Sequence, residues 1–423
     1  MYKGLSKELC CFIEKSPSCY HVVDNIENEL LNKSYERLEL YEEWELEGGG
    51  KYYLISNSST IIAFELPKTD YQGFRIVASH SDFPTFKIKA NPEIKFQDFY
   101  TSLSVEKYGG PLMAPWFDRP LSIAGRVVHE EANCMCEKHI DFGTDCVSIV
   151  NLAIHMNREA NSGMKYSVAK DMVPLWAGAE NEKTFAQEVA RVAEIEEAQI
   201  LDMDLFLYNR MEGRIWGAND EFISAPKLDD LQCAFASVKA FLEAECGTEV
   251  KVLAVFDNEE VGSNTRQGAK SNLLESVLKR IAENQGRTEE GYSMDLAHSF
   301  LLSADNAHAT HPNYVEKADK TNHPYLNGGV VIKYAANQQY TTDATTGAYV
   351  KLLCRNAGVP YQIYHNHSDV AGGSTLGNLA IQQVPIPAAD IGAPQLAMHS
   401  PYETGGVKDT YYLKTLMKRF FEG

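Results

Sequence analysis

The sequence is poor in positive charge. It contains 39 lysines and arginines against 58 aspartates and glutamates, so its formal net charge is −19 at pH 7. Nucleic acids and anionic membranes are bound by basic surfaces, and we therefore expect neither as a partner. The acidic excess favours solubility and by itself indicates no substrate.

The cysteines form no metal-binding or disulfide motif. Their number is odd and no CxxC pair occurs, so neither a disulfide framework nor a thiolate zinc knuckle is indicated. The nine cysteines stand at positions 10, 11, 19, 134, 136, 146, 233, 246 and 354.

Long apolar runs are also absent. No run approaches the length of about 20 residues that spans a bilayer. The opening segment MYKGLSKELCCFIEK carries charges inside any apolar core, which argues against a signal peptide. We therefore expect a cytoplasmic protein, and its 423 residues favour two domains over one.

Strands and helices are expected to alternate regularly after residue 226, which is typical of a helix-flanked, mostly parallel sheet in an α/β fold. The expected strands there cover 251–256, 299–304, 330–334, 361–364 and 385–391, and the expected helices cover 231–244, 271–283, 342–357 and 409–421. Before residue 90 we expect helices over 5–13 and 20–31, a hairpin over 51–66 and a strand over 75–79.

The middle of the chain differs in character. Short strands, glycines and prolines dominate it, with a helix expected over 183–199 and a helical or extended segment over 149–158. We predict a smaller, β-rich domain over residues 91–225, inserted between two parts of the first domain, 1–90 and 226–423.

The stretch KVLAVFDNEEVGS (251–263) organises the functional prediction. An apolar strand ends at Phe256, and Glu259 and Glu260 follow where the chain leaves the sheet, at the edge where ligands of α/β proteins gather. One glutamate can bind a metal while its neighbour takes a proton from water. A bare pair of glutamates is more often a solvated surface pair.

Five segments present a possible ligand at the end of a strand or helix. They are ASHSD with His80 and Asp82, KLDD with Asp229, DNEE with Glu259 and Glu260, SADNAH with Asp305, and LAMHS with His399. Two cations with one bridging carboxylate need such a set, and imidazole and carboxylate ligands suit zinc, manganese or cobalt.

Each of these residues also has an ordinary explanation. His80 or His399 can be a buried, hydrogen-bonded histidine, Asp229 can cap the helix that follows it, and Asp305 can be a turn residue. These explanations weaken jointly, because all five segments reach the same edge of one predicted sheet.

The chain resembles the aspartyl aminopeptidase family of two-metal exopeptidases over nearly its whole length. The resemblance lies in SHSDFPTFKIK (79–89), YGGPLMAPWFDRPLSIAGRV (108–127), NLAIHMNR (151–158), NDEFISAPKLDDL (219–231), NEEVGSNTRQGA (258–269), SADNAHATHPNY (303–314), GGSTLG (372–377) and DIGAPQLAMHS (390–400). It implies a zinc-peptidase-like fold and an aminopeptidase activity. Such an enzyme removes the first residue, preferably Asp or Glu, from peptides with a free N-terminus.

The resemblance also implies roles for the candidate residues. Two divalent ions per chain, zinc or else manganese or cobalt, are held by His80, Asp229, Glu260, Asp305 and His399, with Asp229 as the bridge. Glu259 is then the general base, and Asp82 orients His80 and so selects its tautomer.

Further implications concern the substrate and the assembly. The substrate side chain is expected to meet Lys333, Tyr340 and His308. The inserted domain is expected to mediate dimerisation, with His155 reaching the neighbouring active site, in a homo-oligomer of twelve subunits. His155 can equally be a histidine on the polar side of a helix, and Lys333 can pair with a protein carboxylate.

Two departures from the family pattern and two competing functions stay open. Asp230 stands where an Asn is common, and the unusual residues His365-Asn366-His367, which we expect close to the pocket, leave the fine specificity open. The competing functions are an aminopeptidase that prefers neutral or basic residues and a non-catalytic scaffold that retains the fold.

Overall fold

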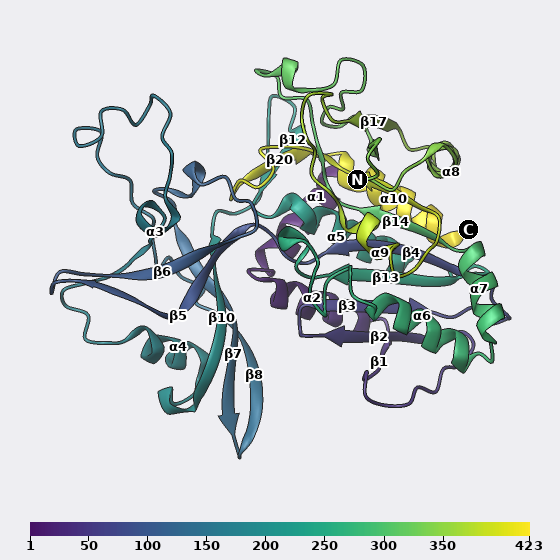
Figure 1. The fold of residues 1–423 in the computed structure, drawn as a ribbon, viewed down its shortest axis with the longest axis horizontal. Helices are drawn as coiled ribbons and strands as arrows, with labels where there is room; N and C mark the ends of the chain where they lie inside the picture. The colour runs from purple at the N-terminus through teal and green to yellow at the C-terminus, as the bar shows by residue number, and fades with distance from the viewer.

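Three β-sheets organise the chain, which the computed structural model describes from residue 1 to residue 423 (Figure 1). The central sheet has nine strands in the order β1-β2-β3-β13-β4-β14-β18-β16-β17. These strands are β1 (Glu36–Arg37), β2 (Lys51–Ser56), β3 (Thr60–Glu65), β4 (Phe74–His80), β13 (Val250–Phe256), β14 (Phe300–Ala304), β16 (Val330–Tyr334), β17 (Tyr361–His365) and β18 (Ala388–Gly392). The four inner strands β13, β4, β14 and β18 are parallel, whereas β3 and β16 join them antiparallel. The prediction of a mixed, mostly parallel sheet is therefore confirmed.

Helices cover both faces of the central sheet. Alternate strand residues point to opposite faces, so Val77 and Leu253 join one core of 45 buried residues, and Ile76 and Val252 join another of 28. Helices α1 (Tyr2–Glu14), α2 (Cys19–Leu31), α5 (Leu228–Glu243), α8 (Ala344–Ala357) and α10 (Asp409–Glu422) pack on the first face. Helices α6 (Leu273–Asn284), α7 (Glu289–His298) and α9 (Leu376–Ala380) pack on the second.

A six-stranded antiparallel sheet stands to one side of the central sheet (Figure 1). It has its own core of 18 buried residues, in which Phe86, Leu103 and Leu205 take part. Its elements are β5 (Thr85–Phe96), β6 (Tyr100–Tyr108), β7 (Leu121–Glu131), β8 (Cys134–Asp141), β9 (Leu175–Gly178) and β10 (Ile200–Asn209), together with the 3-10 turns η1 (Ala114–Trp116) and η2 (Glu197–Gln199) and the helices α3 (Val168–Asp171) and α4 (Phe185–Ala193).

The third sheet bears on the limits proposed for the inserted domain. Its strands β11 (Arg214–Trp216), β12 (Phe222–Ala225), β20 (Glu403–Gly406), β19 (Pro394–Leu396) and β15 (Ala307–His308) come from distant parts of the chain. Since β11 and β12 join this sheet and β5 starts at residue 85, strand pairing supports an inserted unit over 85–209. The division of the chain into domains stays a proposal.

Two segments of the middle region differ from expectation. Residues 149–158 form neither a helix nor a strand beyond an isolated bridge at Ile149. The helix expected over 183–199 stops at Ala193, because Glu194 takes a left-handed conformation (φ 54°) that ends it.

Helix α7 was not expected, since its sequence EEGYSMDLAH lacks an apolar stripe. No helix of the structure combines the length and the apolarity needed to cross a membrane.

The carboxyl ends of β4, β13 and β14 meet at one edge of the central sheet. Phe256 at the end of β13 lies opposite His80 at the end of β4, and Ser303 of β14 lies opposite Ala78. The loops that follow these strands therefore start side by side, and one of them contains the 3-10 turn η3 (Glu259–Val261). The remaining short turn, η4 (Val315–Lys317), lies beyond β15.

We predict that Gly392→Ala in β18 destabilises the protein. A Cβ atom at this position would run into the backbone carbonyl oxygen of Asp305, which cannot move without disturbing β14 and the loop after it. Overpacking of this kind costs about 1–3 kcal/mol, so the thermal midpoint of unfolding should fall. Gly4→Ala in α1 is the control, because nothing lies within 4 Å of its added methyl group. Equal midpoints for the two variants would contradict the prediction.

Candidate metal centre

The turn after β13 places two glutamates over the sheet edge. Asn258 adopts a left-handed conformation (φ 62°), which asparagine tolerates, and Gly262 does the same at the other end of η3 (φ 95°). The Asn258 amide holds the turn, since it donates to the Tyr108 hydroxyl (2.9 Å) and accepts from Thr265 (2.8 Å). Glu259 and Glu260 therefore sit on a short, braced turn.

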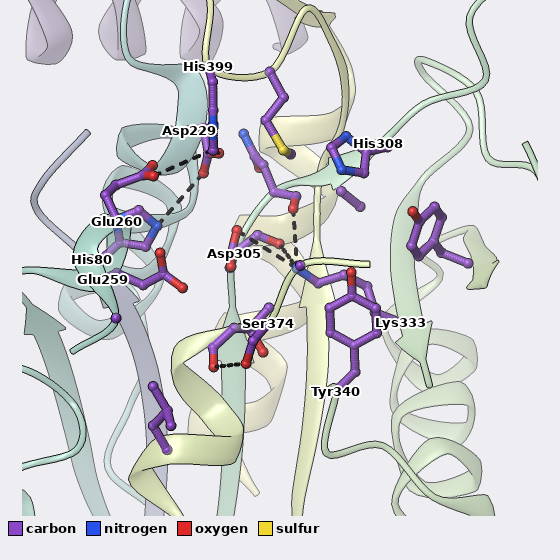
Figure 2. Close-up of a pocket in the computed structure, with 18 residues that line it drawn as sticks. His80, Asp229, Glu259, Glu260, Asp305, His308, Lys333, Tyr340, Ser374 and His399 are labelled. Carbon is purple, nitrogen blue, oxygen red and sulfur yellow. Dashed lines mark hydrogen bonds and ion pairs between the residues drawn. The ribbon is translucent and has the colours of Figure 1, made fainter. Parts of the chain in front are cut away.

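All five predicted metal ligands line one cavity of about 360 Å³. His80 is the last residue of β4, Asp305 follows β14, Asp229 lies at the start of α5, and His399 lies between β19 and β20. Figure 2 shows Asp305 in the middle of the cavity. On one side of it lie His80, Asp229, Glu259, Glu260 and His399, and on the other lie Lys333, Tyr340 and His308.

The ligand atoms lie close enough to share cations. His80 Nε2 is 3.7 Å from Asp229 Oδ1, and His399 Nε2 is 3.4 Å from Asp229 Oδ2 and 3.5 Å from Glu260 Oε2. Asp229 therefore belongs to two groups whose ligand atoms all lie within 4.8 Å of one another. One group also contains His80, Asp230 and Asp305, and the other contains Glu260 and His399. His80 forms a third such group with Glu259 and Glu260.

The donor set fits a pair of divalent ions of the zinc type. It contains imidazoles and carboxylates without a thiolate, which suits zinc, manganese or cobalt. Asp229 Oδ1 is buried and has no hydrogen-bond partner in the protein, as expected for an atom that binds a cation. Asp229 connects the group that contains Asp305 with the group that contains His399, which is the position of a bridge.

Burial makes the charges of this cluster costly. It raises the pKa of Glu259 to about 8 and that of Asp305 to about 6, and neighbouring carboxylates add to both shifts. Burial alone would lower the pKa of His399, but its hydrogen bond with Asp229 and the charge of Glu260 outweigh this and raise the pKa to about 10. Negative charge is thus in excess, and cations would relieve the repulsion.

Asp82 holds the ligand loops of β4 and β13 together. One of its oxygens accepts the backbone N–H of Glu259 and the other that of Glu260, both at 3.1 Å. Tyr108 donates its hydroxyl to the same carboxylate at 2.6 Å. His80 Nδ1 lies 3.1 Å from the Asp82 carbonyl oxygen and 3.4 Å from the carboxylate, so Nδ1 carries the proton and Nε2 is free to bind a cation.

Asp230 and Glu403 are two buried acids behind the ligands. Asp230, noted as a departure from the family pattern, accepts the backbone N–H of His80 at 3.2 Å. Glu403 is 1% exposed and was missed in the sequence, although it stands only four residues after His399. It accepts the backbone N–H of Asp229 at 2.9 Å and that of His399 at 2.7 Å, and so joins two ligand segments that are distant in sequence.

The candidate substrate residues divide into two sets. Lys333, Tyr340 and His308 line the cavity. The Lys333 ammonium donates to the backbone carbonyl oxygens of Asp305 (2.7 Å) and Asn306 (3.2 Å) and lies 3.8 Å from the Asp305 carboxylate. His155, in contrast, lies in an exposed loop between β8 and α3 and is not among the residues that line the cavity.

Comparison with known proteins gives consistent results along the whole chain. A family model described as "Aminopeptidase I zinc metalloprotease (M18)" matches residues 12–421. A curated relative from Clostridium novyi, a "Probable M18 family aminopeptidase 2", is 41% identical over 98% of both chains. The cryo-EM structure of the complex of Ape4 and Nbr1 contains a chain that is 33% identical, with a TM-score of 0.96, over 100% of this chain and 86% of the other. The dodecamer of S. cerevisiae mApe1 has 29% identity and a TM-score of 0.88, over 100% of this chain and 97% of the other.

We predict that Glu403→Gln weakens zinc binding with little change in the fold. The amide keeps the size of the carboxylate but replaces one acceptor oxygen by an NH₂ group, which faces a backbone N–H and cannot accept from it. Loss of a residue that hydrogen-bonds to metal ligands typically lowers the metal affinity 10–100-fold. Zinc affinity measured by competition with a chromogenic chelator checks this, with exposed Glu212→Gln as the control. Equal affinities for the two variants would argue against this role.

Proposed function

The chain belongs to the aminopeptidase I zinc metalloprotease (M18) family and is a metalloaminopeptidase, and we propose that it removes an N-terminal Asp or Glu from peptides. We further propose two divalent ions per chain, zinc or else manganese or cobalt, with the ligands His80, Asp229, Glu260, Asp305 and His399. The observation that supports the acidic preference is the buried Lys333 in the cavity that holds these ligands and Glu259.

Glu259 is the general base of this proposal. Its carboxylate lines the cavity and forms no hydrogen bond within the protein, while Asp82 holds its backbone N–H. The bound cations would polarise the scissile carbonyl and lower the pKa of a water molecule. Glu259 accepts the proton of the attacking water and then passes it to the nitrogen of the leaving amine, so that the peptide bond breaks without a net gain or loss of protons.

Lys333 supplies the charge for an acidic side chain. An ammonium has three N–H donors, and two of those of Lys333 are used by the carbonyl oxygens of Asp305 and Asn306. The third is available for a substrate carboxylate, and the ring of Tyr340 lies 5.3 Å from the nitrogen. The nearby Asp305 carboxylate raises the pKa of Lys333 against the opposing effect of burial, so the lysine stays charged at neutral pH.

We propose that the protein assembles through dimers of the inserted unit into a dodecamer, the state named for the S. cerevisiae mApe1 structure. His155 is flanked by apolar side chains that are largely exposed in the single chain, which supports a partner there. They are Val150 (55% exposed), Leu152 (57%), Ile154 (46%) and Met156 (76%). We propose that His155 reaches the active site of a neighbouring subunit and that the protein is cytoplasmic.

The two competing functions have less support. Preference for a basic first residue would place a second cation near the charged Lys333, which is repulsive. A non-catalytic scaffold would not need the complete set of predicted ligands together with a free Glu259 in one cavity. Less than about one metal ion per purified chain would favour the scaffold.

We predict that Glu259→Gln keeps the metal content and loses nearly all turnover. The amide has the same shape but cannot accept a proton from water, and the loss of a general base lowers kcat by about 10²–10⁴-fold. The measurements are metal analysis of the purified variant and hydrolysis of an aspartyl anilide. Wild-type turnover of the variant would show that another group is the base.

We predict that Lys333→Met selectively weakens acidic substrates. Methionine fills much of the same space without the charge, so kcat/KM for aspartyl and glutamyl anilides should fall by about tenfold or more. Values for leucyl and alanyl anilides should change much less. A uniform loss across this panel would indicate that Lys333 supports the Asp305 loop and does not select the substrate.

A further inference from the structure

The segment YGGPL (108–112) connects the six-stranded sheet to the metal centre. Tyr108 is the last residue of β6 and pairs with Thr85, the first residue of β5. Its ring packs edge-on against that of Phe206 in β10, with the ring centroids 5.6 Å apart. The six-stranded sheet therefore determines where the Tyr108 side chain lies.

The Tyr108 hydroxyl reaches the turn that carries the proposed base. It donates to the Asp82 carboxylate at 2.6 Å and accepts from the side-chain amide of Asn258 at 2.9 Å. Asp82 in turn accepts the backbone N–H groups of Glu259 and Glu260. Burial, and then the charge of Asp82, raise the pKa of Tyr108, so the hydroxyl keeps its proton and stays a donor. One hydroxyl thus holds both the support and the start of this turn.

Two glycines let the next part of the chain pass close to the proposed ligands. Gly109 adopts a left-handed conformation (φ 70°), and a Cβ atom there would lie 3.1 Å from Cβ of Glu260. The Gly110 carbonyl oxygen lies 3.1 Å from Nδ1 of His399. A carbonyl only accepts, so in the neutral imidazole the proton is on Nδ1 and Nε2 is free to bind a cation. The backbone N–H of Leu112 donates to the carbonyl oxygen of His399 at 2.9 Å.

The contacts of segment 108–112 therefore act at two places in the centre. The contact of Tyr108 acts on the turn of Glu259 and Glu260, and those of the next residues act on His399. All of these contacts start within a few residues of the end of β6. A displacement of the six-stranded sheet against the central sheet would move the supports of both places together.

We propose that Tyr108 is a positioning residue for Glu259, and that segment 108–112 makes the metal centre depend on the position of the six-stranded sheet. This inference rests on the proposed metal centre and general base, and it adds what keeps the two in place. Without the Tyr108 hydroxyl the Asp82 carboxylate can turn away from the backbone of Glu259, which misplaces the base. Lys333, where the substrate side chain is proposed to bind, is not part of this network.

Tyr108→Phe tests the positioning role. The ring and its packing remain and only the hydroxyl is lost, so we expect kcat for an aspartyl anilide at saturating zinc to fall about tenfold, the effect of one hydrogen bond to a charged group. KM should stay near the wild-type value, because the substrate side chain is proposed to bind at Lys333.

Tyr208→Phe is the matched control. It removes a bond of similar length, 2.7 Å from the Tyr208 hydroxyl to Asp141, within the six-stranded sheet, and kcat should not change. Unchanged kcat in Tyr108→Phe, a loss that appears in KM alone, or equal losses in both variants would overturn the proposal.

A pair of glycine variants tests the second part without measuring activity. Gly109 and Gly143 both have a positive φ (70° and 63°), so an alanine strains the backbone at either position. A methyl group at 109 meets Glu260, whereas nothing lies within 4 Å of one at 143. We expect Gly109→Ala to lower the zinc affinity about tenfold, measured by competition with a chromogenic chelator, and Gly143→Ala to keep it. Equal affinities of the two variants would overturn the proposal.

Hydrogen exchange tests the same connection from the other side. Coupling between two sites is reciprocal, so zinc should hold segment 108–112 if the segment supports the metal centre. Exchange of peptides that contain Leu112, followed by mass spectrometry, should slow when zinc is added to the metal-free protein. The same exchange with and without zinc would contradict the coupling.

Failure of the proposed function would give a different result. A wild-type protein that binds no zinc, or that does not cleave the anilide, would contradict the proposed centre or its base and this inference with them. Wild-type zinc binding and turnover, together with unaffected Tyr108 and Gly109 variants, would overturn the positioning role alone.

Discussion

The site depends on several carboxylates that are buried close together at the carboxyl edge of the central sheet. Asp229, Glu260 and Asp305 approach two histidines within a few ångströms, and Glu259 lies among them. Burial raises the pKa of Glu259 and Asp305, which shows how unfavourable their charges are in this place. Such an arrangement becomes favourable when cations share it, because the ions replace the water that the carboxylates have lost.

Two acids outside the proposed ligand set hold the proposed ligands. Asp82 accepts the backbone N–H groups of Glu259 and Glu260, and Glu403 accepts those of Asp229 and His399. Each carboxylate thus ties ligand segments to one another through the backbone, and it leaves the ligand side chains free. This explains why residues that are hundreds of positions apart in sequence can keep a common geometry.

The same edge of the sheet also separates the two kinds of charge that a peptide would meet. Most of the carboxylates and His80 and His399 gather on the side of Glu260, while Lys333 stands on the other side. An acidic first side chain that binds at Lys333 would therefore lie away from the carboxylate cluster. The lysine donates a hydrogen bond to the backbone of Asp305, so the residue proposed to recognise the substrate is connected directly to a proposed metal ligand.

The sequence by itself determined the central sheet and the chemistry of its edge. Apolar runs such as Val252–Phe256 are buried wherever they occur, and the ionisable residues after them have to emerge at the sheet edge. The middle region was less predictable, because the end of α4 at Glu194 and the turns over 149–158 depend on local backbone geometry and weak patterns. Only the tertiary structure decided that Asp229 lies in two groups of possible ligands and that Glu403 connects two of the segments that carry them. The physical reason is that these features are distances between segments far apart in sequence, which hydrophobic pattern and residue type do not encode.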